Sequence, residues 1–333
     1  MKEIIITKEQ ENQRMDKFLL KYLNTASKSF IYKMLRKKRI KYNNKRAEGN
    51  EILKCEDTLQ FYLSEETMDK FMEEKEVYEA KRHFGIVYED DNILIVSKPA
   101  GLLTHPEKST DKNTLIDQIL YYLYEKGQYN PSKEASFVPA VCNRLDRNTS
   151  GLVIAGKNLT AVQEINQAIA QHKVEKFYLT MVKGIITQKQ ELTAYIVKNE
   201  ENNQVSVFQN ECIGSKKIVT QYEPLKTANG YTLLKVKLIT GKSHQIRAHL
   251  KAIGNCIAGD RKYGEKELND LLKQKYALSN QFLHAYMLVW KQKEGNLSYL
   301  YGKEWTAPLP ISLYNITKDI FNWTNDKESS IIK

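Results

Sequence analysis

Apolar residues near the N-terminus follow the spacing of a helix. The positions that recur at intervals of three and four are Met15, Phe18, Leu19, Tyr22 and Leu23. This repeat places all of them on one face, which predicts an amphipathic helix. A second helix is predicted to follow, with an apolar stripe made of Phe30, Ile31, Met34 and Leu35. Either Ser27 or Ser29 can cap its first turn.

The pattern then changes to short strands. We expect strands at residues 40–42 and 59–63, and a turn at residues 43–44. With the two helices, these strands form a compact module at residues 12–64. The strongly acidic stretch 65–82 lacks turn residues, so we interpret it as a linker that can be helical.

The rest of the chain mixes strands and helices in irregular order. Strands are predicted at residues 86–98, where two surround an EDDN turn, and at 152–157, 176–184 and 231–239. Helices are predicted at residues 112–137, which can also be loop-rich, and at 159–169 and 243–253. This order lacks the strict alternation of a doubly wound fold and predicts an α+β domain. We place that domain at residues 83–318 and a C-terminal tail at 319–333.

Positive charge is concentrated in one segment of the chain. The 333 residues carry a net charge of +11, and residues 14–46 alone contain twelve Lys or Arg against one acid, Asp16. The remainder of the chain therefore has no net charge. Because Lys and Arg neutralise phosphates and release condensed counterions, this segment predicts a polyanionic partner.

Several classes of protein are not expected. No apolar run reaches the ~18 residues of a membrane-spanning helix, and the N-terminus lacks the apolar core of a signal peptide. We therefore expect a cytoplasmic protein with no membrane partner. The cysteines predict neither disulfides nor a metal site, because they are far apart in the sequence: Cys55, Cys142, Cys212 and Cys256.

A carboxylate between two arginines is the first candidate for chemistry. Asp146 lies between Arg144 and Arg147 in a loop that leads directly into the strand at 152–157. Adjacent positive charge keeps a carboxylate ionised, and a rigid strand positions it, as a carboxylate nucleophile requires. The alternative is a surface aspartate in an ordinary salt-bridged turn.

The second candidate is the helix that Ser243 is expected to cap. His244, Arg247 and Lys251 lie on one of its faces, and Lys242 precedes it. Together with the free N–H groups of the first turn, these cations favour an anionic ligand. A merely solvated basic face would give the same pattern.

Tyr178 is the third candidate. It lies on a predicted strand whose alternation places Phe177, Leu179 and Met181 on the opposite face. A single tyrosine in a strand is more often a packing residue than a catalytic one.

Taken together, these segments resemble the RluA-type family of RNA pseudouridine synthases, preceded by an S4 RNA-binding domain. The family's catalytic motif, tyrosine segment and C-terminal motif resemble NRLDRNTSGLVIAGKN, EKFYLTMVKG and TGKSHQIRAHLKAIGNCIAGDRKYG. Its opening strand pair and a late core strand resemble FGIVYEDDNILIVSKPAGLLTHP and FLHAYMLVW. The S4 module resembles RMDKFLLKYLNTASKSFIYKMLRKKRIKYNNKR.

The resemblance implies a fold and a set of roles. It implies a small α/β S4 module and then a domain with a mostly antiparallel central sheet, flanking helices and a central cleft. It assigns Asp146 as the essential carboxylate, Arg247 as its partner, and Tyr178 as the residue that stacks on uracil and assists loss of the C5 proton. Substrate contacts are expected from Asn143, Arg144, Lys242, His244 and Gln245. Contacts of the S4 module with RNA are expected from Arg14, Lys28, Lys33, Arg36, Lys37, Lys38, Arg39 and Lys41.

Two residues depart from the family pattern. Asn143 stands where many members have His, and Lys242 stands where Arg is usual. Neither is the inferred nucleophile. Lys242 keeps the charge but loses the bidentate fork of Arg, so we expect a weaker phosphate contact there.

The implied activity is the isomerisation of uridine to pseudouridine in structured RNA. We expect 23S ribosomal RNA as the substrate, with transfer RNA as the second choice, a monomeric enzyme, and no cofactor or metal. Asp146 can act by attack at C1′ or by removing the ribose 2′ proton to give a glycal, and the sequence does not distinguish these routes. Two other functions fit parts of the pattern: a non-catalytic S4-type RNA-binding or ribosome assembly factor, and a glycosidase that releases free base.

Overall fold

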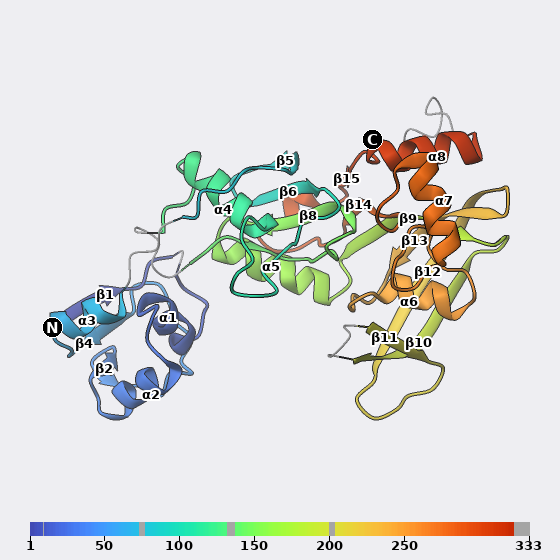
Figure 1. The fold of residues 1–333 in the computed structure, drawn as a ribbon. Coiled ribbons are helices and arrows are strands. Elements are labelled where there is room, and N and C mark those ends of the chain that lie inside the picture. The colour runs from blue at the N-terminus through green and yellow to red at the C-terminus, as the bar shows by residue number, and fades with distance from the viewer. Residues whose placement is uncertain (9, 73–76, 132–136, 200–203, 323–333) are drawn as a thin grey trace.

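The chain forms two sheets, each with its own helices (Figure 1). The structure is a computed structural model that describes residues 1–333 except 9, 73–76, 132–136, 200–203 and 323–333. Within the described ranges, no helix is long and apolar enough to cross a lipid bilayer.

The smaller sheet is antiparallel and belongs to the N-terminal module. Its strand order is β1-β4-β2-β3. The strands are β1 (Lys2–Ile5), β2 (Ile40–Tyr42), β3 (Lys45–Arg46) and β4 (Thr58–Phe61). The helices of this module are α1 (Met15–Tyr22), α2 (Lys28–Arg36) and α3 (Glu65–Phe71). Both helices predicted from apolar spacing are therefore confirmed.

Local sequence signals position α2 and the turn that follows β2. Ser27 is the cap of α2, because its hydroxyl accepts a hydrogen bond of 3.2 Å from the N–H of Phe30. Asn43 and Asn44 adopt left-handed φ angles of 46° and 63°. Two such residues in succession are what a tight hairpin turn requires, and Asn tolerates them well.

The N-terminal module is larger than the predicted range 12–64. β1 pairs with β4 from the first residues of the chain onwards. Met68 of α3 is buried in the same apolar cluster as Leu19 and Leu35. Residues 65–71 therefore complete this module and are not a linker. The acidic composition of this segment concealed the apolar side of α3.

The larger sheet has 11 strands and a mostly antiparallel arrangement. Its order is β11-β10-β12-β13-β9-β14-β8-β6-β5, with β15 paired to β14 and β7 paired to β8. Its strands are β5 (Gly85–Glu89), β6 (Ile93–Lys98), β7 (Ala140–Val141), β8 (Ser150–Gly156), β9 (Val174–Lys183), β10 (Gln190–Asn199), β11 (Gln204–Phe208), β12 (Lys216–Ala228), β13 (Tyr231–Leu238), β14 (Leu283–Trp290) and β15 (Glu304–Thr306). Among the described strands, only β14 and β8 are paired in parallel. The α+β prediction is confirmed.

Helices cover both faces of this sheet. They are α4 (Leu115–Glu125), α5 (Leu159–Ala170), α6 (Gln245–Ala252), α7 (Lys266–Tyr276) and α8 (Ile311–Phe321), with a short 3₁₀ helix η1 (Ser298–Leu300). All residues of β8 are buried, because Leu152 packs with Ile165 of α5 on one face and Val153 packs with Leu115 of α4 on the other. β8 is therefore a rigid base for the loop that precedes it.

The strand that carries Tyr178 also has two covered faces. Tyr178 packs in the cluster that contains Leu115, whereas Leu179 and Met181 pack against α7 and α8. The predicted alternation of β9 is confirmed. Phe321 is buried in the cluster under α8, so the helix extends past residue 319 and the predicted tail 319–333 begins too early. The rest of that range, 323–333, lies outside the described residues.

Candidate active site

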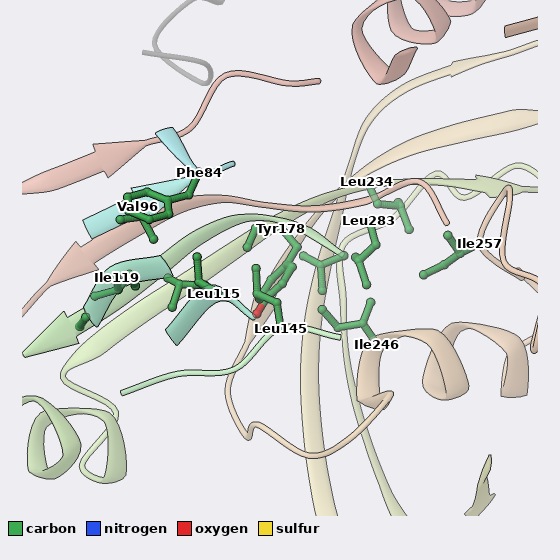
Figure 2. Packing of buried hydrophobic residues seen from close by; sticks show 14 of the residues in the cluster. Phe84, Val96, Leu115, Ile119, Leu145, Tyr178, Leu234, Ile246, Ile257 and Leu283 are labelled. Carbon is green, nitrogen blue, oxygen red and sulfur yellow. The ribbon is translucent and has the colours of Figure 1, made fainter. Parts of the chain in front are cut away.

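A cleft of about 1040 Å³ lies where the loop before β8, the strand β9 and the turn before α6 meet. These segments carry the three residues assigned to catalysis, and Asp146, Tyr178 and Arg247 all line the cleft. Figure 2 shows Tyr178 packed in the apolar cluster near Leu145. The structure thus brings together three residues from distant segments, of which Asp146 and Arg247 are 101 positions apart in the sequence.

The loop that carries Asp146 is anchored on both sides. The hydroxyl of Thr104 donates a hydrogen bond of 2.9 Å to the carbonyl oxygen of Leu145. After the loop, Gly151 has a φ of +114°, and a Cβ atom there would lie 2.1 Å from the carbonyl oxygen of Ala285. Only glycine permits this close approach to β14. The position of Asp146 therefore depends on a contact with a strand from the far end of the chain.

A buried histidine strengthens the same contact. Ser150 Oγ lies 2.8 Å from His284 Nδ1, and His284 Nε2 lies 3.2 Å from the carbonyl oxygen of Ala307. Burial lowers the pKa of His284 to about 4, so the ring is neutral at physiological pH. Its Nε2 donates to the carbonyl, and its Nδ1 accepts from the serine hydroxyl. Sequence reasoning missed this pair, because a lone histidine in an apolar strand gives no signal.

Lys98 also holds the loop. Its ammonium donates to the carbonyl oxygens of Pro99 at 3.0 Å, Leu102 at 2.7 Å and Arg147 at 3.0 Å. Burial lowers the pKa of Lys98 to about 7, although the negative charge of Asp146 opposes this shift. No sequence pattern singles out this lysine, since only the fold removes it from water.

Arg247 connects the candidate catalytic carboxylate to a second, fully buried one. Its Nη1 donates to Asp146 Oδ2 at 2.8 Å, while Nε and Nη2 donate to Asp260 at 2.6 Å and 2.9 Å. Burial alone would lower the pKa of Arg247, but the hydrogen bonds and charge of Asp260, with those of Asp146, raise it. Burial would raise the pKa of Asp260, but the hydrogen bonds from Arg247 lower it.

This arrangement fixes the direction of the guanidinium group. The bidentate pairing with Asp260 sets the plane of the fork, and the remaining arm points at Asp146. The side chain of Asp146 is 27% exposed, whereas that of Asp260 is 0% exposed. One carboxylate is therefore accessible from the cleft, and the other is buried and orients the arginine. The predicted Asp146–Arg247 pair is present, and Asp260 was missed.

Tyr178 lines the cleft as a neutral ring. It is 5% exposed. Burial, and then the charge of Asp146, raise its pKa above the ordinary value of a tyrosine. A phenol with a raised pKa remains protonated at neutral pH and is a weak general base.

His244 lies beside Asp146 in an unusual backbone conformation. It has a φ of 53° and directly precedes the first residue of α6, so it takes the capping position that the sequence assigned to Ser243. Its Nδ1 lies 3.0 Å from the hydroxyl of Tyr263, and its Nε2 lies 3.9 Å from Asp146 Oδ2. His244 thus begins α6 without capping it through its side chain, and its ring lines the cleft.

Two residues expected to contact substrate are instead bound to the protein itself. Gln245 accepts from Thr240 Oγ1 and the N–H of Lys242, and its amide donates to Val219 and Thr220, so its four hydrogen-bonding positions are filled. The side chain of Asn143 bonds to the backbone of β8, donating to one carbonyl and accepting from one N–H. Both residues shape the cleft and have their polar atoms engaged. Arg144 and Lys242 are exposed at the lining of the cleft, as expected.

Most of the basic residues of the N-terminal module face solvent. Of the residues expected to contact RNA, those that are exposed and lie on or directly after α2 are Lys28, Lys33, Arg36, Lys37, Lys38 and Arg39. Lys41 is half-buried, with its ammonium 4.8 Å from the centre of the Tyr62 ring. Arg14 differs from all of them, because it donates two hydrogen bonds to Asp16, at 3.0 Å and 3.1 Å. The hydrogen bond from Arg14 lowers the pKa of Asp16.

Metal ligands are not clustered in the part of the chain that the structure describes. No group of three or more His, Cys, Asp or Glu side chains is arranged to hold a metal ion among these residues.

Comparison with known proteins identifies the family. The profile of the family described as RNA pseudouridylate synthase matches residues 92–252. An RNA pseudouridine synthase of Mycoplasma capricolum is 34% identical over 309 residues, which are 91% of this chain and 96% of that protein. Ribosomal large subunit pseudouridine synthase C of Rickettsia bellii is 32% identical over 302 residues, which are 87% and 92% of the two chains.

The fold agrees with this relationship. The structure of human RNA pseudouridylate synthase domain containing 4 superposes with a TM-score of 0.55 at 19% identity and covers 70% of this chain and 91% of the human one. The carboxylate–arginine pair of Asp146 and Arg247 lies within residues 92–252, which the family profile matches. The chain belongs to the RluA-type family of RNA pseudouridine synthases and is an enzyme that isomerises uridine in RNA.

Proposed function

We propose that Asp146 is the catalytic carboxylate of this enzyme. The observation that carries the proposal is the geometry of this side chain, which is partly exposed in the cleft and held by Arg247 at 2.8 Å. A carboxylate oriented by a buried cation is suited to an electron-poor anomeric carbon, as in retaining glycosidases. Asp260 supports the same arrangement by fixing Arg247.

The reaction breaks the N1–C1′ bond of uridine, turns the uracil and forms a C5–C1′ bond. C5 loses a proton and N1 gains one, so the isomer has the same composition as the substrate. Asp146 assists bond breaking either by attack at C1′ or by removing the 2′ proton. Tyr178, which burial keeps protonated, stacks on the uracil as a neutral ring, and proton loss from C5 is completed by another acceptor such as water.

The target uridine must leave its stack to reach this cleft, because C1′ and C5 are inaccessible inside a helix. Arg144, exposed at the cleft lining, is suited to occupy the space that the flipped base leaves. We propose that the N-terminal module is an S4-type RNA-binding domain whose exposed cations hold the surrounding RNA by its phosphates.

We propose 23S ribosomal RNA as the substrate. The support is the name of the Rickettsia relative, a ribosomal large subunit pseudouridine synthase, together with the basic module that suits a large structured RNA. Transfer RNA is the alternative substrate.

The test is a pseudouridine map of total RNA by carbodiimide labelling in a deletion strain. The strain is complemented with the wild-type protein, Asp146→Asn, or Asp91→Asn as an exposed control. Asp146→Asn is expected to abolish specific pseudouridines in large-subunit RNA, while Asp91→Asn restores them. Full modification by Asp146→Asn would contradict the assignment, and lost sites confined to transfer RNA would contradict the substrate. Release of free uracil would indicate a glycosidase, and an unchanged map would indicate a non-catalytic assembly factor.

A further inference from the structure

Three lysines of the catalytic domain differ in how their half-buried or buried ammonium groups are satisfied. Lys98 donates to three carbonyl oxygens. Lys157 lies 3.1 Å from Glu89 and donates to the carbonyl oxygen of Asp90 at 2.6 Å. The side chain of Lys176 has no hydrogen-bond or ion-pair partner among the residues that the structure describes. Lys176 is only half-buried, so its ammonium keeps access to the cleft. Because cations partly withdrawn from water are normally paired, an ammonium in this position is suited to bind an anionic ligand.

Lys176 lies inside the active-site cleft. It precedes Tyr178 by two positions on β9, so the two side chains emerge on the same face of the strand, and both line the cleft. Its Nζ lies 3.7 Å from the place where a Cβ atom of Gly241 would be. The ammonium therefore lies next to the turn before α6, at a residue that has no side chain to cover it.

The surroundings of Lys176 favour a negatively charged ligand. Burial lowers the pKa of Lys176, and no carboxylate offsets this effect. The acidic residues that line the cleft are Glu107 and Asp146, and Asp146 is already paired with Arg247. The other charged lining residues are cationic: Arg144, Arg147, Lys198 and Lys242. A ligand with a full negative charge is favoured here over a neutral carbonyl group.

We propose that Lys176 binds a phosphodiester group of the RNA strand that carries the target uridine. Its ammonium donates to a non-bridging phosphate oxygen beside the turn at residues 240–242. The proposal adds a binding site for the RNA backbone to the proposed function. It rests on that function in one respect, namely that the target strand must enter this cleft. Such a contact fixes the position of the strand without reading its sequence.

The first experiment measures affinity for an RNA hairpin that the wild-type protein converts. All proteins carry Asp146→Asn so that the hairpin remains unmodified during the measurement. Lys176→Met is expected to weaken binding about tenfold and to reduce the slope of log affinity against log salt by about 0.7 to 0.9, the contribution of one phosphate contact. Lys173→Met is the matched control, since Lys173 is an exposed lysine three positions away, and it should change neither quantity.

The second experiment identifies the contacted group. Neutral methylphosphonate linkages are placed one at a time around the target uridine. One linkage should weaken binding about tenfold with Lys176 present and have no effect on Lys176→Met. Equal losses in both proteins at every linkage would overturn the phosphate site and point to a contact with the base.

A urea unfolding measurement tests separately whether Lys176→Met is folded. Removing an unpaired, half-buried charge should leave the urea midpoint of Lys176→Met unchanged or raise it. Unchanged affinity and salt slope in this folded variant would also overturn the proposal. If Asp146→Asn retains turnover, the proposed role of Asp146 is overturned but the phosphate site is not. The same two binding experiments are then made with the fully isomerised hairpin, which has the same phosphate backbone.

Discussion

Arg247 in the cleft and Arg36 on α2 carry the same guanidinium group in opposite surroundings. The side chain of Arg247 is 8% exposed and donates to two carboxylates, whereas Arg36 is exposed among neighbouring cations. A cation that is withdrawn from water needs an acceptor for each of its donor groups. If such a cation is removed, the buried carboxylate that it paired with keeps an uncompensated charge. An exposed cation has little effect on folding and acts on RNA through a field that salt screens. Position therefore decides whether a positive charge shapes a site or attracts a ligand.

The largest effect should come from breaking the buried network. Arg247→Met leaves Asp260 buried and unpaired, which is expected to lower the free energy of unfolding by about 3 to 5 kcal/mol and to abolish turnover. Adding Asp260→Asn should restore part of the stability but not the activity, since Asp146 still lacks its partner. Urea unfolding and single-turnover assays measure the two effects, and strictly additive stability losses would contradict the network.

The exposed cations should behave in the opposite way. Replacing Arg36, Lys37, Lys38 and Arg39 by Gln is expected to weaken RNA binding at least about tenfold and to flatten its salt dependence. The free energy of unfolding should change by less than about 0.5 kcal/mol per site. The control replaces three exposed lysines of α7 by Gln: Lys266, Lys273 and Lys275. An equal loss of affinity in the control would mean that these cations act only through total charge.

Lys98 provides a smaller, pH-dependent test of how a buried cation affects stability. Its pKa falls from 10.5 to about 7 on folding. Between these values the unfolded chain retains a proton that the folded protein has released, so stability should increase as pH rises through this window. The slope should approach about 1 kcal/mol per pH unit and be absent in Lys98→Met. Urea midpoints at two pH values within the window measure it, and equal slopes would show that Lys98 remains charged.

The smallest effect is expected for the basic residue of the N-terminal module that already has a carboxylate. Arg14→Gln should reduce RNA affinity less than Lys33→Gln, because the hydrogen bonds to Asp16 already neutralise Arg14. Salt titrations of both variants make the comparison. A larger loss for Arg14→Gln would mean that RNA displaces Asp16.

Local patterns in the sequence predicted local structure well. The apolar spacing around Phe18 predicted α1, and alternation in β9 predicted the faces of Tyr178 and Leu179. These predictions depend on periodicities that a short window contains. The predicted cap of α6 is wrong. His244 and not Ser243 takes the capping position, and its side chain contacts Tyr263 and lies near Asp146 instead of capping the helix.

Residues whose roles depend on burial could not be predicted in this way. Asp260 and Lys98 look like ordinary surface charges until the fold removes them from water. Gln245 looked like a substrate contact because the segment resembled a binding motif, but its side chain holds the turn. The pairing of Asp146 with Arg247 came from family resemblance, since no local pattern joins residues 101 positions apart.

The contact between β8 and β14 also has a consequence for protein synthesis. Ser150 is bonded to His284, 134 positions later, so the ribosome makes the catalytic loop long before the strand that supports it. The N-terminal module has its described core contacts within the first 72 residues and can fold as it emerges. We therefore expect nascent chains arrested before β14 to hold a folded N-terminal module and an incomplete cleft. An intermediate of this kind would have the exposed cations of α2 in place before the cleft is complete.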